Sequence, residues 1–178
     1  MGALELYVRT VDRINSVVGN VVAWMTLGTV LVCFGTVYFR YALDSGFIWM
    51  QEAYVWQHAI VFLVGAGYTL LHGGHVRVDI FYARMTARNQ ARVEIFGTFA
   101  FMMPFLWVMF DKAWPFFVTS FVGREGSQQP DGIQNVWLLK STLVLFCVVV
   151  GLQGIATICR NLLFLGGDAK YAPPGGTH

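Results

Sequence analysis

Residues 14–39 read INSVVGNVVAWMTLGTVLVCFGTVYF, and these 26 residues carry no charged side chain between Arg13 and Arg40. A helix rises 1.5 Å per residue, so about 20 apolar residues cross the roughly 30 Å of hydrocarbon in a bilayer. A signal peptide has an apolar region of only about 7–15 residues and a small-residue cleavage site after it. This run is longer and ends in Tyr38-Phe39-Arg40. It therefore predicts an uncleaved transmembrane helix.

Three further apolar stretches predict spans, at about residues 53–71, 93–114 and 139–160. Of the 178 residues, 56% are hydrophobic and 12% are charged, against roughly 45–50% and ~25% in soluble domains. We therefore expect an all-α membrane protein with four transmembrane helices in a single domain over residues 1–167. A disordered tail is expected at 168–178. Pro104 is expected to kink the third span, which a membrane bundle tolerates.

The positive residues divide unevenly between the two sides that four spans create. Eight fall on the side of the termini, and four fall on the other side: Arg40, Lys112, Arg124 and Lys140. Because cytoplasmic segments carry the excess of Lys and Arg, both termini are expected in the cytoplasm. The net charge of +2 comes from scattered residues, so no nucleic-acid partner is expected.

The segment 44–52, before the second span, is too apolar for a free loop. In helical register Trp49 and Trp56 share one face, from which Glu52 turns away. We expect a short amphipathic helix at the membrane interface, anchored by a belt of aromatic residues. The alternative is that the same face docks another membrane subunit.

Arg84, Arg88 and Arg92 recur at every fourth residue before the third span. This spacing predicts one face of a short helix. Lipid head groups are the expected partners of these like charges, because the cytoplasmic leaflet is negatively charged. A protein partner is the alternative.

Residues suited to catalysis or cofactor binding are sparse. His58 is the one histidine well inside a predicted span, so no opposed pair of haem ligands is expected. We expect His58 instead to make a hydrogen bond to another helix. The cysteines are isolated, and the other ionisable residues of the spans lie at their edges. A transporter that holds its own cargo usually places ionisable residues at mid-membrane. The sequence therefore predicts no enzyme, no metal site and no cofactor, but an accessory membrane subunit.

The stretch from Trp49 to Phe81 contains a Trp-x-x-Glu start, a Phe-x-x-Gly-Ala helix and a Gly-His-x-x-Val-Asp turn. The residues are Trp49, Glu52, Phe62, Gly65, Ala66, Gly74, His75, Val78 and Asp79. This pattern resembles the small permease subunit, or Q subunit, of the tripartite ATP-independent periplasmic (TRAP) transporters. A second set is similar to the subgroup labelled for mannitol, chloroaromatic compounds or 2-oxo acids: Ser120, Glu125, Ser127, Pro130, Gly132, Trp137, Leu138, Lys140 and Leu152-Gln153-Gly154.

The resemblance implies a subunit of a sodium-coupled uptake system in a bacterial cytoplasmic membrane. The chain would pair with a large permease subunit that holds the sodium and substrate sites. A periplasmic binding protein would deliver an organic acid to the pair. The small subunit would anchor the large one as a scaffold, and no cofactor is expected in this chain.

Several residues are expected to be structural or to contact a partner: Trp49, Glu52, Trp56, Gly65, His75 and Asp79. Glu52 would cap or pair at the outer interface. His75 and Asp79 would pair with each other, or with Arg77 and the partner, although Asp79 could equally be a solvated helix start.

Residues 115–138, between the third and fourth spans, are rich in glycine and proline. This composition predicts a shaped outer loop and no helix. We hypothesise that Arg124, Glu125 and Asp131 in this loop help to dock the binding protein. The alternative is that the loop only connects helices and packs on the large subunit. For the whole chain, the other function classes to test are a membrane anchor of a haem-containing respiratory enzyme and a self-assembling channel or exporter.

Overall fold

The computed structural model describes residues 2–74, 82 and 84–172. It contains α1 (Ala3–Ala42), α2 (Ile48–Val64), α3 (Ala66–Leu71), α5 (Ala87–Gly97), α6 (Met103–Val122) and α7 (Trp137–Leu165). A π-helical turn, η1 (Thr98–Met102), joins α5 to α6, and a 3₁₀ turn, η2 (Ala169–Tyr171), follows α7. The described residues contain no strand. Four helical stretches are long and apolar enough to span a membrane, which confirms the predicted all-α membrane fold.

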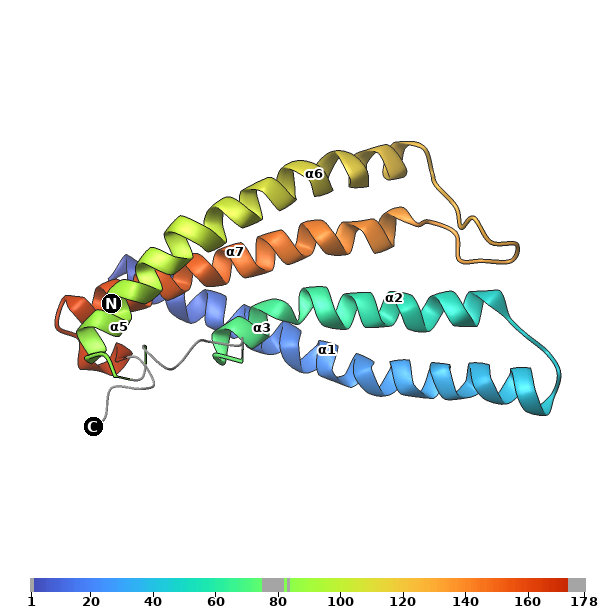
Figure 1. Ribbon diagram of the computed structural model, residues 1–178, viewed down its shortest axis with the longest axis horizontal. Helices are drawn as coiled ribbons and strands as arrows, with labels where there is room; N and C mark the ends of the chain where they lie inside the picture. The colour runs from blue at the N-terminus through green and yellow to red at the C-terminus, as the bar shows by residue number, and fades with distance from the viewer. Residues whose placement is uncertain (1, 75–81, 83, 173–178) are drawn as a thin grey trace.

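The four spans form an elongated bundle with two distinct ends (Figure 1). The start of α1 and the end of α7 lie at one end, which we name the terminal end. The connection 43–47 between α1 and α2 and the loop 123–136 before α7 lie at the other, which we name the loop end. An even number of crossings places both ends of the chain on the same side of a membrane.

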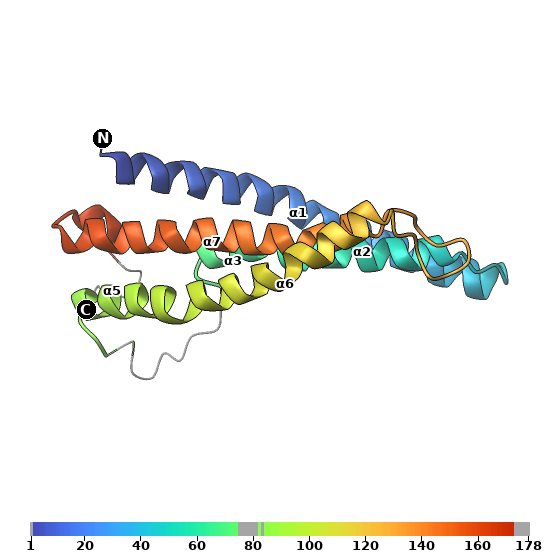
Figure 2. The same cartoon turned by 90° about the horizontal axis from the view of Figure 1, so that it is seen from above.

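Helix α7 is the centre of the bundle. It contacts α1, α2, α3, α5 and α6, and Figure 2 shows it between α1 and the α5–α6 stretch. Of the most apolar window in each span, 39% is buried in α7 but only 6–11% in the other three spans. The three outer spans therefore leave most of their apolar surface uncovered by this chain.

The first and third helices extend beyond the predicted spans. α1 begins at Ala3 rather than near residue 14, and α6 continues through Pro115 to Val122. The predicted loop 115–138 is therefore too long. Phe117 and Phe121 pack edge-on against Trp137 of α7, and this aromatic contact stabilises the additional helical turns.

The sequence predicted a separate interfacial helix over 44–52, and this prediction is wrong. Residues 43–47 form a short connection, and α2 begins at Ile48, so that Glu52 lies in its second turn. The ring of Phe47 packs edge-on against Phe39 of α1, with 5.6 Å between centroids. This contact turns the chain back along α1 at once and leaves no room for an intervening helix.

The disturbance expected at Pro104 takes the form of the π-helical turn η1 directly before it. The Met103 N–H donates to the Thr98 carbonyl, five residues back. Proline cannot continue the hydrogen-bond ladder, and a π turn shifts the register at such a point. The helix therefore continues past Pro104.

The tail predicted to be disordered at 168–178 is folded in its first part. Tyr171 of η2 is buried and packs with Val8 of α1 and Cys159 of α7. The turn after α7 uses Gly167 at a φ of 108°, a conformation that favours glycine. Residues 173–178 lie outside the described part of the chain.

Candidate functional site

At the loop end, the carboxylate of Glu52 on α2 holds the loop 123–136. It accepts hydrogen bonds from the hydroxyl of Ser127 and from the backbone N–H of Ile133, the latter at 2.6 Å. A Cβ on Gly132 would lie 2.8 Å from Glu52 Oε1, so a glycine is needed where the loop passes the carboxylate. Glu52 thus fixes a loop some 80 positions away in sequence, as an acceptor for two donors.

A second carboxylate fixes the start of the same loop. Lys140 of α7 donates to Glu125, and its ammonium also lies 4.0 Å from the ring centre of Phe116. The hydrogen bond from Lys140 holds the pKa of Glu125 below its ordinary value. Arg124 and Asp131, by contrast, are exposed and have positive φ angles of 46° and 59°. Of the three predicted docking residues, Glu125 therefore belongs to the loop's own framework.

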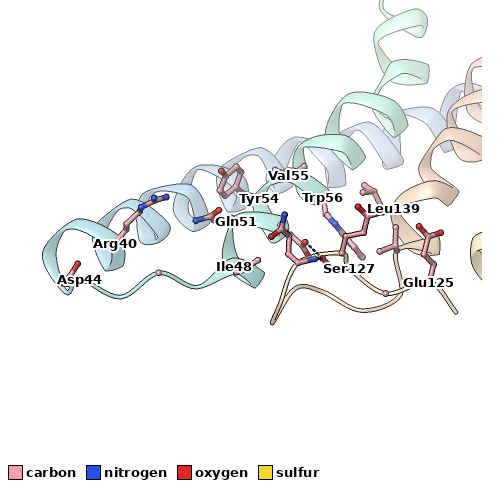
Figure 3. A pocket seen from close by; sticks show the side chains of 16 residues that line it. Arg40, Asp44, Ile48, Gln51, Tyr54, Val55, Trp56, Glu125, Ser127 and Leu139 are labelled. Atoms are coloured by element: carbon pink, nitrogen blue, oxygen red, sulfur yellow. Dashed lines mark hydrogen bonds between the residues drawn. The ribbon is translucent and has the colours of Figure 1, made fainter.

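Between the start of α2 and this loop lies an open cleft of about 860 Å³. Arg40 and Asp44 lie at one end of it, Glu125 at the other, and Gln51 and Ser127 between them (Figure 3). The cleft is large enough to receive a polar segment of another protein. Trp56 also lines it, whereas Trp49 is half exposed beside Phe47.

At the terminal end, a polar cluster joins α1 to α7. Gln153 is fully buried, accepts a hydrogen bond from Asn15 at 2.6 Å and donates to Asp12 at 3.1 Å. Arg160 donates to both carboxylate oxygens of Asp12 at 2.8 Å. Such bidentate, charge-assisted bonds fix geometry as well as adding energy. Sequence reasoning missed this cluster, although opposite charges flanking the first and fourth spans on one side could have indicated it.

Close helix approach in the membrane depends on glycine. A Cβ on Gly19 would overlap the ring of Tyr68, and one on Gly67 would overlap Val149 and the side chain of Asn15. Gly65, a predicted packing residue, instead lies at the junction of α2 and α3, with Val22 of α1 near it. Small residues at these points let α1, α3 and α7 meet.

The predicted row of basic residues is divided by the start of α5. Arg88 and Arg92 are exposed on the helix, but Arg84 lies in the turn before it. The extended backbone of Thr86, with a ψ of 151°, ends the turn and begins the helix, so the three arginines do not share one helical face. His75 and Asp79 lie outside the described residues.

His58 does not make the hydrogen bond between helices that the sequence suggested. Its side chain is exposed and stacks on Phe62, with 6.4 Å between ring centres. The described residues offer its ring no hydrogen-bond partner, and they contain no group of three His, Cys, Asp or Glu side chains that could hold a metal ion.

The fold is that of a polytopic membrane protein whose outer spans have most of their apolar surface uncovered by this chain. The family model described as "Tripartite ATP-independent periplasmic transporters, DctQ component" matches residues 29–164. The chain therefore belongs to the DctQ family and is a small permease subunit of a TRAP transporter. Neither the curated proteins nor the solved structures contain a match to this chain.

Proposed function

We propose that this chain is the non-catalytic scaffold of a sodium-coupled TRAP transporter that imports organic acids. It pairs with the large permease subunit and anchors it in the bacterial inner membrane, with the terminal end in the cytoplasm. The observation that carries the proposal is the match of the DctQ family model to residues 29–164. The low burial of three of the four spans, at 6–11%, leaves surface that such a partner can cover. Helices that this chain does not cover offer a static surface to a larger membrane protein.

The distribution of fixed contacts supports the same role. Two ion pairs that join different parts of the chain lie toward the two ends, Asp12 with Arg160 at one and Glu125 with Lys140 at the other. Contacts at both ends stiffen the bundle along its length. A rigid body of this kind is what a moving transport domain needs beside it. The resemblance to the family supports the proposed sodium coupling and organic acid substrate.

The test is reconstitution into vesicles with an imposed sodium gradient. The large subunit, this chain and the binding protein together should take up organic acid, whereas this chain alone should move no solute. Transport by this chain alone would instead support a channel or exporter, and full uptake by the large subunit without this chain would contradict the scaffold role.

Docking of the binding protein at the loop end is the second part of the proposal. It is supported by the open cleft and by the exposed charges of Arg124 and Asp131. Reversing both charges should weaken uptake at limiting binding protein and leave uptake at saturating binding protein unchanged. Because Glu125 holds the loop, its reversal would disturb the fold and is not a clean test. Unchanged uptake at limiting binding protein would remove the docking role.

A further inference from the structure

His58 lies near the middle of the α2–α3 span, about 15 Å from its start at Ile48 and about 20 Å from its end at Leu71 at 1.5 Å per residue. Its ring is exposed on the helix surface and finds no hydrogen-bond partner in the described part of the chain. Lipid tails cannot donate or accept a hydrogen bond. Ionisable residues at this depth almost always face protein or a water-filled cavity.

Beside His58, the surface between α1 and α2 is hollowed into a groove of about 550 Å³. We name it the α1–α2 groove. It is lined by Thr29, Val30, Cys33 and Phe34 from α1, and by Tyr54, Val55 and His58 from α2. The groove therefore combines apolar walls, which accept an apolar side chain, with the hydroxyls of Thr29 and Tyr54 and the ring of His58.

The α6 stretch, far from this groove, has a different character. Residues 99–110 read FAFMMPFLWVMF, in which the indole N–H of Trp107 is the one strong side-chain hydrogen-bond donor. Phe99, Phe105 and Val108 are each more than half exposed, and lipid satisfies apolar side chains of this kind. The α1–α2 groove differs from this stretch because the ring of His58 at its edge can both donate and accept a hydrogen bond.

We propose that the α1–α2 groove is the contact for a transmembrane helix of a second polytopic chain. That helix places an apolar side chain between Val30 and Val55 and a polar side chain on the ring of His58. The inference rests on the proposed function, in which this second chain is the large permease subunit. It adds which face of the small subunit the large one covers.

The native cysteines allow a direct test. Cys33 lines the groove and is exposed, whereas Cys147 and Cys159 are buried. Because the proposed partner helix covers Cys33 in the complex, the chain is labelled at Cys33 in detergent before assembly, with a maleimide that carries a photoactivatable benzophenone, and is then reconstituted with the large permease subunit. After illumination, the labelled chain should crosslink to the large permease subunit. The matched control is Cys33→Ser with Val108→Cys, because Val30 in the groove and Val108 on α6 are equally exposed at 58%.

Each outcome decides one question. Crosslinking from Cys33 and not from the Val108→Cys control supports the proposal. Crosslinking to the large subunit from the control alone would overturn the assigned face while leaving the proposed function in place. A product with a second copy of this chain would also overturn it. If this chain forms no complex with a large permease subunit, the proposed function itself is overturned.

Substitution of His58 tests the polar half of the contact. His58→Leu should lower recovery of the large subunit about three- to thirtyfold in a mild-detergent pull-down, as expected for one interhelical hydrogen bond in a membrane. His58→Gln, which can still donate and accept, should restore most of it. If the His58→Leu and His58→Gln variants both recover the large subunit at the wild-type level, the ring of His58 has no partner.

Discussion

The clamp at the loop end predicts a local effect of Glu52→Gln. The substitution keeps the size of the side chain but removes its charge, and it turns one of the two acceptor positions into an N–H₂ donor. In the wild-type chain, the carboxylate of Glu52 accepts hydrogen bonds from the hydroxyl of Ser127 and from the N–H of Ile133. The neutral amide can accept from the Ile133 N–H with its oxygen and donate to the Ser127 hydroxyl with its N–H₂ group, so two charge-assisted hydrogen bonds become two neutral ones.

The magnitude follows from the two bonds. A hydrogen bond to a charged group contributes about 1.5–3 kcal/mol and a neutral one about 0.5–1.5 kcal/mol. Replacing two charged bonds by two neutral ones at this partly buried site should cost about 2 kcal/mol after allowance for solvent. Since 1.4 kcal/mol is a factor of ten in an equilibrium, the loop should open about thirtyfold more often.

Hydrogen exchange at the Ile133 amide measures this opening directly, because that N–H is the donor to Glu52. The matched control is Asp131→Asn, which also removes one negative charge, but at an exposed position of the loop itself. Exchange at Ile133 should accelerate in Glu52→Gln and stay unchanged in the control. Equal protection in wild type and Glu52→Gln, or equal loss in both variants, would refute the reasoning.

Three further predictions concern the rest of the framework. Gly67→Ala should lower stability by about 1–3 kcal/mol in thermal unfolding in detergent, because a Cβ there overlaps its neighbours, whereas Gly97→Ala, with open space around it, should not. Asp12→Asn and Arg160→Met should each destabilise, and a double-mutant cycle should return a coupling of about 1–2 kcal/mol, because the two side chains share a bidentate bond; additive losses would count against it. The lowered pKa of Glu125 means that its ion pair stabilises the folded loop fully above the ordinary pKa of 4.5, and that this stabilisation is lost as the pH falls below that value. Hydrogen exchange of the loop amides, corrected for its intrinsic rate, should therefore be constant at neutral pH and rise only in acid.

The spans could be predicted from the sequence because each is a continuous apolar run, and the hydrophobic thickness of a bilayer fixes how long such a run must be. The ends of the helices could not. α1 begins well before its apolar run because Asp12 finds Arg160 on α7, and α6 continues because its aromatic residues find Trp137. Both contacts join distant parts of the chain, which no local pattern reports.

The candidate site was predictable in part for the same reason. Glu52 was expected to pair at its interface, but its donors, Ser127 and Ile133, are visible only in the folded chain. Regular spacing was misleading where a turn intervenes, as at Arg84 before α5. The buried hydrogen bond between Asn15 and Gln153 spans 138 positions, and polar residues within apolar runs carry no sign of which helix they face.

The central claim is that this chain serves as the membrane scaffold of a larger permease. A pull-down from its native membrane in mild detergent, with mass spectrometry of the bound proteins and an absorption scan of the eluate, tests it most directly. The account predicts a colourless complex with a much larger polytopic permease. A red eluate with a haem band, or a chain that purifies alone and still moves solute, would contradict it.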